Sequence, residues 1–192
     1  MAIDAKKVLV GAPNQSSTTG AVQYAAIGTT PPTDAKTAWN AGTYCGYVSE
    51  DGLTLSANFN TVDIKDWSKS TIRTLLDEFS GEVTFNFVQT DYDSLCAIFG
   101  SESVSQSGNK ITINIGAHMT APKVYVFNMK DGEARMRVVL PNAQPVLNGA
   151  LTFVAGAAIN WPVKLTCGAD SNGESIYVYV EEAPSSSGIA GA

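Results

Sequence analysis

The only histidine of the chain, His118, is the residue type best suited to proton transfer near neutral pH. It lies in the stretch Gly-Ala-His-Met-Thr, with no cysteine, second histidine or carboxylate cluster beside it in the sequence. The chain also lacks the Gly-x-Ser-x-Gly turn that presents a nucleophilic serine. Because a charge relay needs a nucleophile and an orienting acid next to the histidine, we predict no catalytic residue and no enzymatic activity.

Oxygen-bearing side chains of the kind that bind hard cations occur at two places. Asp91 and Asp93 form one group, and Asp170, Asn172 and Glu174 form the other. The first pair lies where a helix is expected to begin, and carboxylates there are favoured by the helix dipole. The second group flanks an expected turn. We therefore predict no metal site, and we expect no cofactor.

A third acidic group, Asp77, Glu78 and Glu82, surrounds Ser80-Gly81, where we predict a turn. These carboxylates either decorate a solvated turn or line a negatively charged channel. The sequence leaves both interpretations open.

The formal net charge is −6, and only 12 of the 192 residues are lysine or arginine. No basic cluster is present, so tight binding to nucleic acid through phosphate contacts is not expected. An acidic surface would instead let DNA pass without adsorbing, because like charges repel. Simple solubility explains the charge equally well.

The length suits one domain, which can bury roughly 70% of its unfolded surface. We assign residues 1–183 to this domain, and the small, polar residues 184–192 to a flexible tail. Cys45, Cys96 and Cys167 are odd in number and widely spaced, so we predict small, buried, reduced thiols in a cytoplasmic product. The N-terminal residues predict neither a signal peptide nor a membrane span.

A long strand pattern begins at Asp51-Gly52, a pair of residues typical of turns. Residues 52–59 then alternate between apolar and polar side chains, as in a half-buried strand. After Phe59 the apolar phase slips by one residue, which predicts a bulge near Asn60.

The next segment is ambiguous. Ile72, Leu75, Leu76 and Phe79 have the i, i+3, i+4, i+7 spacing of an amphipathic helix. A strand over 70–79 is the alternative, and we prefer it only because of the family resemblance described below.

A short helix is predicted at residues 90–99. Thr90 and Asp93 have the spacing of a capping box, and Gly100 has the place of a helix-ending glycine.

Asp131-Gly132 predicts a tight hairpin turn. Pairing outward from it sets Phe127 opposite Met136 on an apolar face and Asn128 opposite Arg135 on a polar one.

Asn172-Gly173 predicts a second hairpin, in which Cys167 faces Val178 and Lys164 faces Glu181. With a further short strand at 151–155, about eight strands are expected. The fold class is therefore mainly β, a sandwich or barrel with one short packed helix.

Residues 28–46 form a connection much longer than compact domains usually contain, and such loops tend to be functional. They follow the expected strand 22–27. The loop holds two aromatic residues, Trp39 and Tyr44.

The order of several motifs resembles that of the major tail tube proteins of long-tailed, siphovirus-type bacteriophages. These motifs are the Tyr-Val-Ser-Glu-Asp-Gly turn at 47–52, the Ile-Lys-Asp-Trp segment at 64–67, the Arg-Thr-Leu run at 73–75 and the strand at 84–87. The loop opening also matches the family pattern, at Thr29, Thr30, Pro32, Thr33 and Asp34. In the family this loop reaches a subunit of the next ring, so the resemblance implies a ring-stacking loop with Trp39 and Tyr44 as buried aromatic anchors.

The resemblance further implies a structural virion protein whose strands contribute to an inter-subunit barrel. Hexameric rings would stack into a tail tube around the tape measure protein, with tail terminator and distal tail proteins at its ends. Double-stranded DNA would pass through without specific binding, and no membrane would be involved. The expected location is the virion tail, after assembly in the host bacterial cytoplasm.

Two alternatives remain open from the sequence. One is a contractile-tail or type VI-like tube protein, and the other is a monomeric β-sandwich module that binds carbohydrate or acts as an adhesin. The Ser-rich residues 101–109 have no family counterpart.

Overall fold

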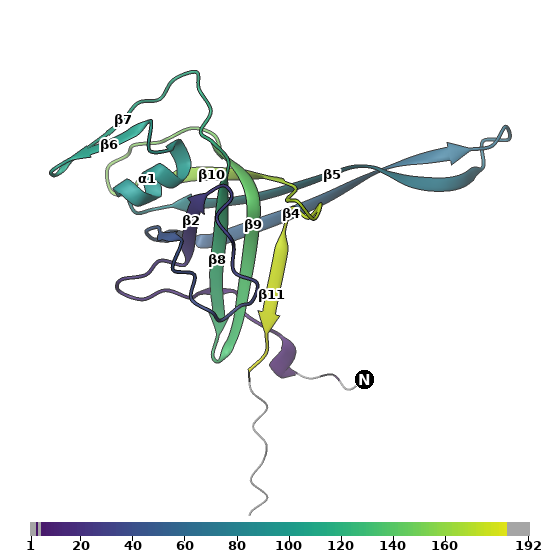
Figure 1. Cartoon of the computed structure of the whole chain (residues 1–192), viewed down its shortest axis with the longest axis horizontal. Coiled ribbons are helices and arrows are strands. Elements are labelled where there is room, and N and C mark those ends of the chain that lie inside the picture. The colour runs from purple at the N-terminus through teal and green to yellow at the C-terminus, as the bar shows by residue number, and fades with distance from the viewer. Residues whose placement is uncertain (1–2, 4, 184–192) are drawn as a thin grey trace, which may run out of the picture.

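One antiparallel sheet of nine strands dominates the computed structural model (Figure 1). The structure describes residue 3 and residues 5–183, so the predicted tail at 184–192 lies outside it. The elements are η1 (Ala5–Lys7), β1 (Ala12–Pro13), β2 (Val22–Ala26), β3 (Thr43–Tyr44), β4 (Val48–Lys65), β5 (Thr71–Phe87), α1 (Tyr92–Phe99), β6 (Val104–Ser107), β7 (Lys110–Ile113), β8 (Lys123–Asp131), β9 (Ala134–Leu147), β10 (Trp161–Gly168) and β11 (Tyr177–Glu181). The described part of the chain is mainly β with one short α-helix, as the sequence predicts.

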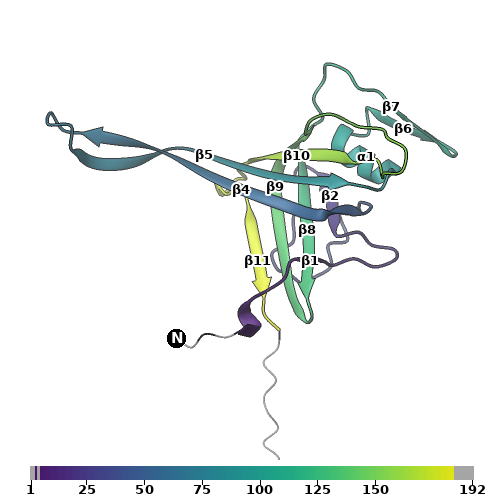
Figure 2. The ribbon, with the colours of Figure 1, turned by 180° about the vertical axis from the view of Figure 1, so that it is seen from behind.

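The strand order is β3-β2-β8-β9-β10-β5-β4, with β1 beside β8 and β11 beside β9. β6 and β7 form a separate two-stranded sheet. Figures 1 and 2 show that β8, β9 and β11 lie along one axis, whereas β10, β5 and β4 cross that axis steeply. The long strand β9 belongs to both groups, because β11 pairs with residues 135–139 and β10 with residues 142–147. The sheet folds over itself like a sandwich and does not close into a barrel.

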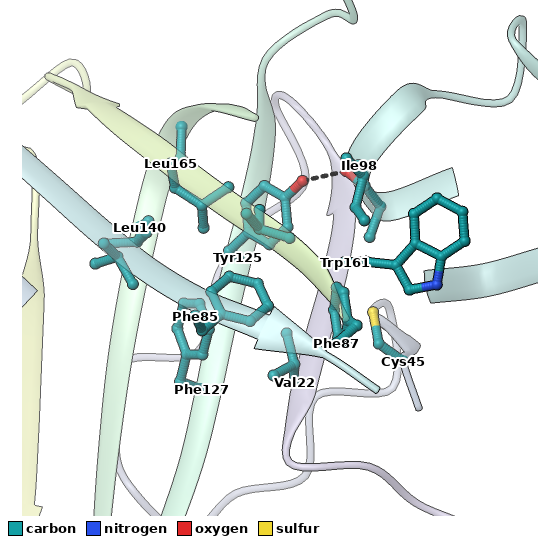
Figure 3. Packing of buried hydrophobic residues seen from close by; sticks show 14 of the residues in the cluster. Val22, Cys45, Phe85, Phe87, Ile98, Tyr125, Phe127, Leu140, Trp161 and Leu165 are labelled. Atoms are coloured by element: carbon teal, nitrogen blue, oxygen red, sulfur yellow. Dashed lines mark hydrogen bonds between the residues drawn. The ribbon is translucent and has the colours of Figure 1, made fainter. Parts of the chain in front are cut away.

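The core lies between these two groups of strands (Figure 3). Alternate residues of β5 and β10 point inward, and Phe85 meets Phe127 of β8 edge to face with ring centroids 5.2 Å apart. Leu140 and Leu165 are fully buried beside them. Each such side chain contributes roughly 1.5–3 kcal/mol through burial, which makes this cluster the main source of stability.

Helix α1 closes one end of the core and confirms the predicted helix, but its cap differs. Asp91 is the N-cap, and its carboxylate accepts a hydrogen bond from the Ser94 amide at 2.7 Å. Thr90 instead accepts a hydrogen bond from the Trp161 indole at 2.9 Å, so the predicted capping box is wrong. Gly100 ends the helix at φ 82°, as expected for glycine. Among the described residues, no helix combines the length and the apolar character that crossing a lipid bilayer requires.

β4 and β5 form one long hairpin that projects from the body as an arm (Figures 1 and 2). Residues 71–79 are strand, so the helix alternative is wrong: Leu75, Leu76 and Phe79 pair across the hairpin with β4. The predicted turn at Ser80-Gly81 is also wrong, because β5 runs through it and the chain turns at 66–70. The predicted bulge near Asn60 is confirmed by a register shift between Asn60 and Thr61.

The β8–β9 hairpin forms as predicted, but its register differs by two residues. Asp131 pairs with Ala134, so the two-residue turn is Gly132-Glu133, with Gly132 at φ 54°. Phe127 then pairs with Val138, and Asn128 with Arg137. A shift of two keeps every side chain on its predicted face.

The hairpin predicted around Asn172-Gly173 does not form. β10 already pairs with β9 on one edge and with β5 on the other, so no edge is left for β11. β11 therefore pairs with the first half of β9, and Lys164 lies opposite Thr84 and Val146 instead of Glu181. The strand predicted at 151–155 is wrong as well, because this segment is an irregular loop.

Candidate assembly interface

The outer edge of β4 is the largest unpaired strand edge in the described part of the chain. This strand contains 18 residues and pairs only with β5 there. At about 3.3 Å per residue it spans roughly 60 Å. A row of free backbone N–H and C=O groups of this length is a template for pairing with another chain.

The outer half of the β4–β5 hairpin carries many apolar side chains that its own domain does not cover. Phe59 and Phe79 form a cross-strand pair with ring centroids 5.0 Å apart, yet both are exposed. The other exposed apolar residues of this arm are Val62, Ile64, Trp67, Ile72 and Leu76. Exposed apolar surface of this extent marks an interaction site.

The three acidic residues singled out in the sequence are separated along β5. Glu82 lies in the body, where Oε1 is 3.4 Å from the Lys164 ammonium on the polar face of the sheet. Asp77 and Glu78 lie further out, on the exposed arm. All three are strand residues, since the predicted turn between them does not exist.

The long loop folds back onto its own sheet. Trp39 is only 6% exposed, packs against Ala25, Val124 and Val126, and donates its indole N–H to the Thr30 carbonyl at 2.9 Å. Trp39 is therefore buried within its own domain, and little of its side chain is exposed to a neighbouring subunit.

The remaining loop residues differ in exposure. Thr30, Thr33 and Tyr44 are exposed, whereas Thr29, Pro32 and Asp34 are half-buried. Thr30, Thr33 and Tyr44 are therefore the loop residues most accessible to a neighbouring copy.

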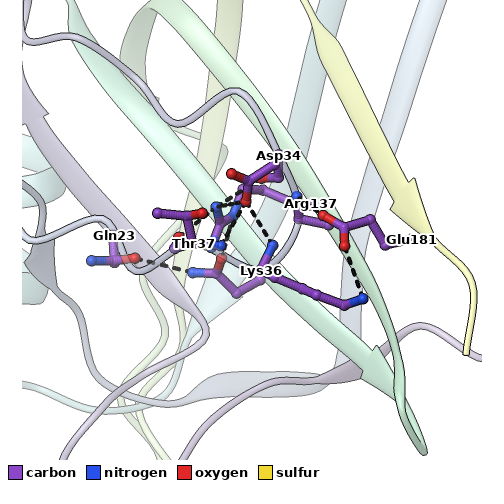
Figure 4. Close-up of polar contacts among 8 residues, drawn as sticks. Gln23, Asp34, Lys36, Thr37, Arg137 and Glu181 are labelled. Atoms are coloured by element: carbon purple, nitrogen blue, oxygen red, sulfur yellow. Dashed lines mark hydrogen bonds and ion pairs between the residues drawn. The ribbon is translucent and has the colours of Figure 1, made fainter. Parts of the chain in front are cut away.

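A chain of polar contacts holds the loop in place (Figure 4). Arg137 of β9 donates Nη1 to the carbonyl oxygens of Asp34 and Thr37, at 2.8 and 2.9 Å, and Nε to Asn128 Oδ1 at 2.7 Å. Asn128 donates to Gln23 Oε1 at 3.1 Å, and Gln23 donates to the Trp39 carbonyl at 2.9 Å.

Glu181 of β11 holds the same loop from the other side. Its carboxylate accepts a hydrogen bond from the Ala35 amide at 3.0 Å and lies 2.9 Å from the Lys36 ammonium. The hydrogen bond from Lys36 lowers the pKa of Glu181 below its ordinary value. Hydrogen bonds from Thr37 likewise lower the pKa of Asp34. Both carboxylates are therefore ionised at neutral pH and contribute to the loop's attachment.

Sequence reasoning missed the residues of this polar chain. Asn128 was expected on the polar face of the β8–β9 hairpin, but its contacts with Gln23 and Arg137 were not predicted. One signal in the sequence could have indicated them. These polar residues lie among apolar residues of the expected strands, and buried polar side chains need hydrogen-bonding partners.

His118 has one partner that the sequence did not reveal, the Ser103 hydroxyl at 2.8 Å from Nε2. Ser103 is only 3% exposed. The contact attaches the 114–120 segment to the body.

The side chains considered above as possible metal ligands have structural roles. Asp91 caps α1, and Asp170 Oδ1 accepts hydrogen bonds from the Asn172 and Glu174 amides at 2.8 and 3.1 Å. Among residue 3 and residues 5–183, no group of three or more His, Cys, Asp or Glu side chains is placed to hold a metal ion. Cys45, Cys96 and Cys167 are free, buried thiols.

Three comparisons with known proteins complete this description. The sequence profile of one family, described as "Phage tail tube protein", matches residues 1–190. No curated protein matches the chain. Eleven chains of solved structures match. One of them, "Cryo-EM structure of the anti-feeding prophage cap (AFP tube terminating cap)", is 13% identical, with 94% of this chain and 100% of that chain covered and a TM-score of 0.45.

Proposed function

The chain belongs to the phage tail tube protein family and is a structural protein of the virion tail, and from this premise we propose that its copies form hexameric rings that stack into the tail tube. The family points to a structural and not an enzymatic role. The proposed number of six copies in each ring rests on the family resemblance.

The unpaired edge of β4 is the observation that carries this proposal. A neighbouring copy that adds a strand there satisfies the free backbone groups and continues the sheet from one subunit to the next. A contact between two different edges is heterologous, and such contacts close into a ring when the rotation per copy allows it.

The polar face of β10, β5 and β4 suits the wall of a conduit. This face carries Glu82 with Lys164, and Thr54 and Thr84 pair across the strands beside them. In the proposed tube, these side chains and Glu78, which has the same alternation as Glu82, face the lumen, and Asp77 lies beside them at the register shift of β5. The tape measure protein and later double-stranded DNA pass along them without specific binding, since no basic cluster is available to hold phosphate groups.

Stacking in this proposal uses the exposed part of the long loop, Thr30, Thr33 and Tyr44. The clamp formed by Arg137 and Glu181 holds this surface in one conformation before contact, which lowers the entropic cost of binding. Tail terminator and distal tail proteins would end the stack, and assembly would take place in the host bacterial cytoplasm.

Negative-stain electron microscopy of the concentrated protein, with sedimentation velocity over a concentration series, tests the proposal. We expect rings or tubes with a central channel. A chain that stays monomeric at high concentration would contradict it.

A further inference from the structure

The tip of the arm presents one fully exposed tryptophan. Trp67 lies in the turn at 66–70 and has a relative exposure of 103%. The Asp66 carboxylate accepts hydrogen bonds from the Ser68 hydroxyl at 2.7 Å and the Ser70 amide at 2.8 Å, which fixes the turn. Tryptophan on a preorganised support is typical of the side chains that dominate binding energy at interfaces.

An apolar cavity lies at the opposite end of the same hairpin. β4 pairs Val48 with Phe87 and then Leu53 with Phe85, so residues 49–52 leave the ladder and bulge outward. The cavity beneath them has a volume of about 430 Å³. Its apolar lining includes Val22, Val48, Leu53, Phe85, Phe127 and Met129.

The cavity is large enough for one indole ring, since pockets that hold small ligands measure roughly 300–1,000 Å³. Its charged rim complements the tip. Glu50 and Asp51 belong to the bulge that borders the cavity. Lys65 and Lys69 flank Trp67, while the Asp66 carboxylate is engaged inside the turn.

The tip cannot reach the cavity of its own chain. Lys65 lies twelve positions beyond Leu53 along β4, which at about 3.3 Å per residue is about 40 Å. Figures 1 and 2 show that the arm leads away from the body. Only another copy can therefore supply the tryptophan.

We propose that Trp67 of one copy inserts into the cavity beneath residues 49–52 of the next copy, with Lys65 and Lys69 against Glu50 and Asp51. This inference rests on the proposed self-assembly and adds the contact that joins the copies. The contact is head-to-tail, because tip and cavity lie at opposite ends of one hairpin, and it repeats from copy to copy. Copies joined in this way are displaced by about 40 Å, the length of the arm.

Intrinsic fluorescence and sedimentation velocity over a concentration series test this contact. Trp39 and Trp161 are 6% and 5% exposed, so acrylamide quenching of the dilute protein reports mainly on Trp67. We expect this quenching to disappear on assembly. Trp67→Ala should raise the concentration needed for assembly at least tenfold, as truncation of an interface tryptophan typically does, and Trp67→Phe should restore part of the loss. Phe153→Ala, at an exposed aromatic residue outside the arm, is the matched control and should assemble like wild type.

A disulfide between copies gives a second readout that does not depend on stability. The double variant Trp67→Cys, Val48→Cys should form covalent multimers larger than dimers on oxidation, whereas each single variant has one accessible thiol and can form dimers at most, since the native cysteines are buried. If wild type assembles but Trp67→Ala assembles equally well and no multimers form, this contact is wrong and the proposed function survives. A wild-type chain that remains monomeric overturns both.

Discussion

Arg137 and Asp34, 103 positions apart in the sequence, are joined by a hydrogen bond of 2.8 Å from the guanidinium Nη1 to the backbone carbonyl. The same guanidinium bonds to Thr37 and Asn128, so a single side chain connects the long loop to β8 and β9. Because Arg137 is only 4% exposed, it has few alternative hydrogen-bonding partners if one of these contacts is lost.

Arg137→Met should therefore destabilise the fold and release the loop. Loss of a buried, charged hydrogen-bonding group costs about 3 kcal/mol, because Asn128 and the two carbonyls lose their donor. Urea denaturation measures the loss, and trypsin should cleave faster at the exposed Lys36. Arg73→Met on the exposed arm is the control and should change stability by less than about 0.5 kcal/mol. Equal stability of the two variants would contradict the role of Arg137.

Trp39→Ala and Tyr44→Ala should distinguish the roles of the two aromatic residues of the loop. Trp39→Ala should cost about 3–5 kcal/mol, as for other buried tryptophans, because it empties part of the core. Tyr44 is 39% exposed, and its truncation should cost less than about 1 kcal/mol while it weakens stacking. Thermal unfolding and electron microscopy of both variants provide the measurements. This pair is a sharper test than deletion of residues 29–44, which would also remove the core side chain. Normal tubes from Tyr44→Ala would argue against a stacking role for that residue.

Hydrogen exchange should detect new pairing along β4. In the monomer, the amides on its outer edge point to solvent and should exchange quickly, whereas the interior strand β8 is protected. On assembly, alternate amides of β4 should become protected, and those of β8 should not change. Unchanged exchange along β4 in assembled particles would contradict the edge contact.

Lys123 should make stability depend on pH in the alkaline range. Its ammonium donates to the Cys96 and Ala97 carbonyls at 2.8 and 3.2 Å, at the C-terminal end of α1. Burial nevertheless lowers its pKa from 10.5 to about 8. Between these values the unfolded chain binds more protons than the folded one, so this lysine's contribution to stability rises with pH across that window.

The predicted rise is about 3 kcal/mol, from about 1.36 kcal/mol per pKa unit. The buried thiols have raised pKa values, so their contribution makes stability fall as the pH rises. Urea denaturation of Lys123→Met and of wild type at several pH values separates the contribution of the lysine from that of the thiols. Parallel pH profiles for the two proteins would contradict the assignment.

The sequence by itself determined the local elements of this protein. Alternation in β4, the turn at Gly132, the bulge near Asn60 and the helix that ends at Gly100 depend on interactions between near neighbours. Local patterns also placed the side chains of β8 and β9 on the correct faces, because the strand period of two survives a register shift of two residues.

Only the tertiary structure decided which strands pair and where the long loop lies. The turn at Gly173 was recognised, but β11 pairs with β9 because β10 has both edges occupied. The helical spacing in 72–79 was overruled by pairing with β4. Trp39 became a core residue because Arg137 and Glu181, more than 90 positions away, hold its loop against the sheet. Contacts between residues so far apart in the chain leave no periodic pattern in the sequence, so they appear only once the chain has folded.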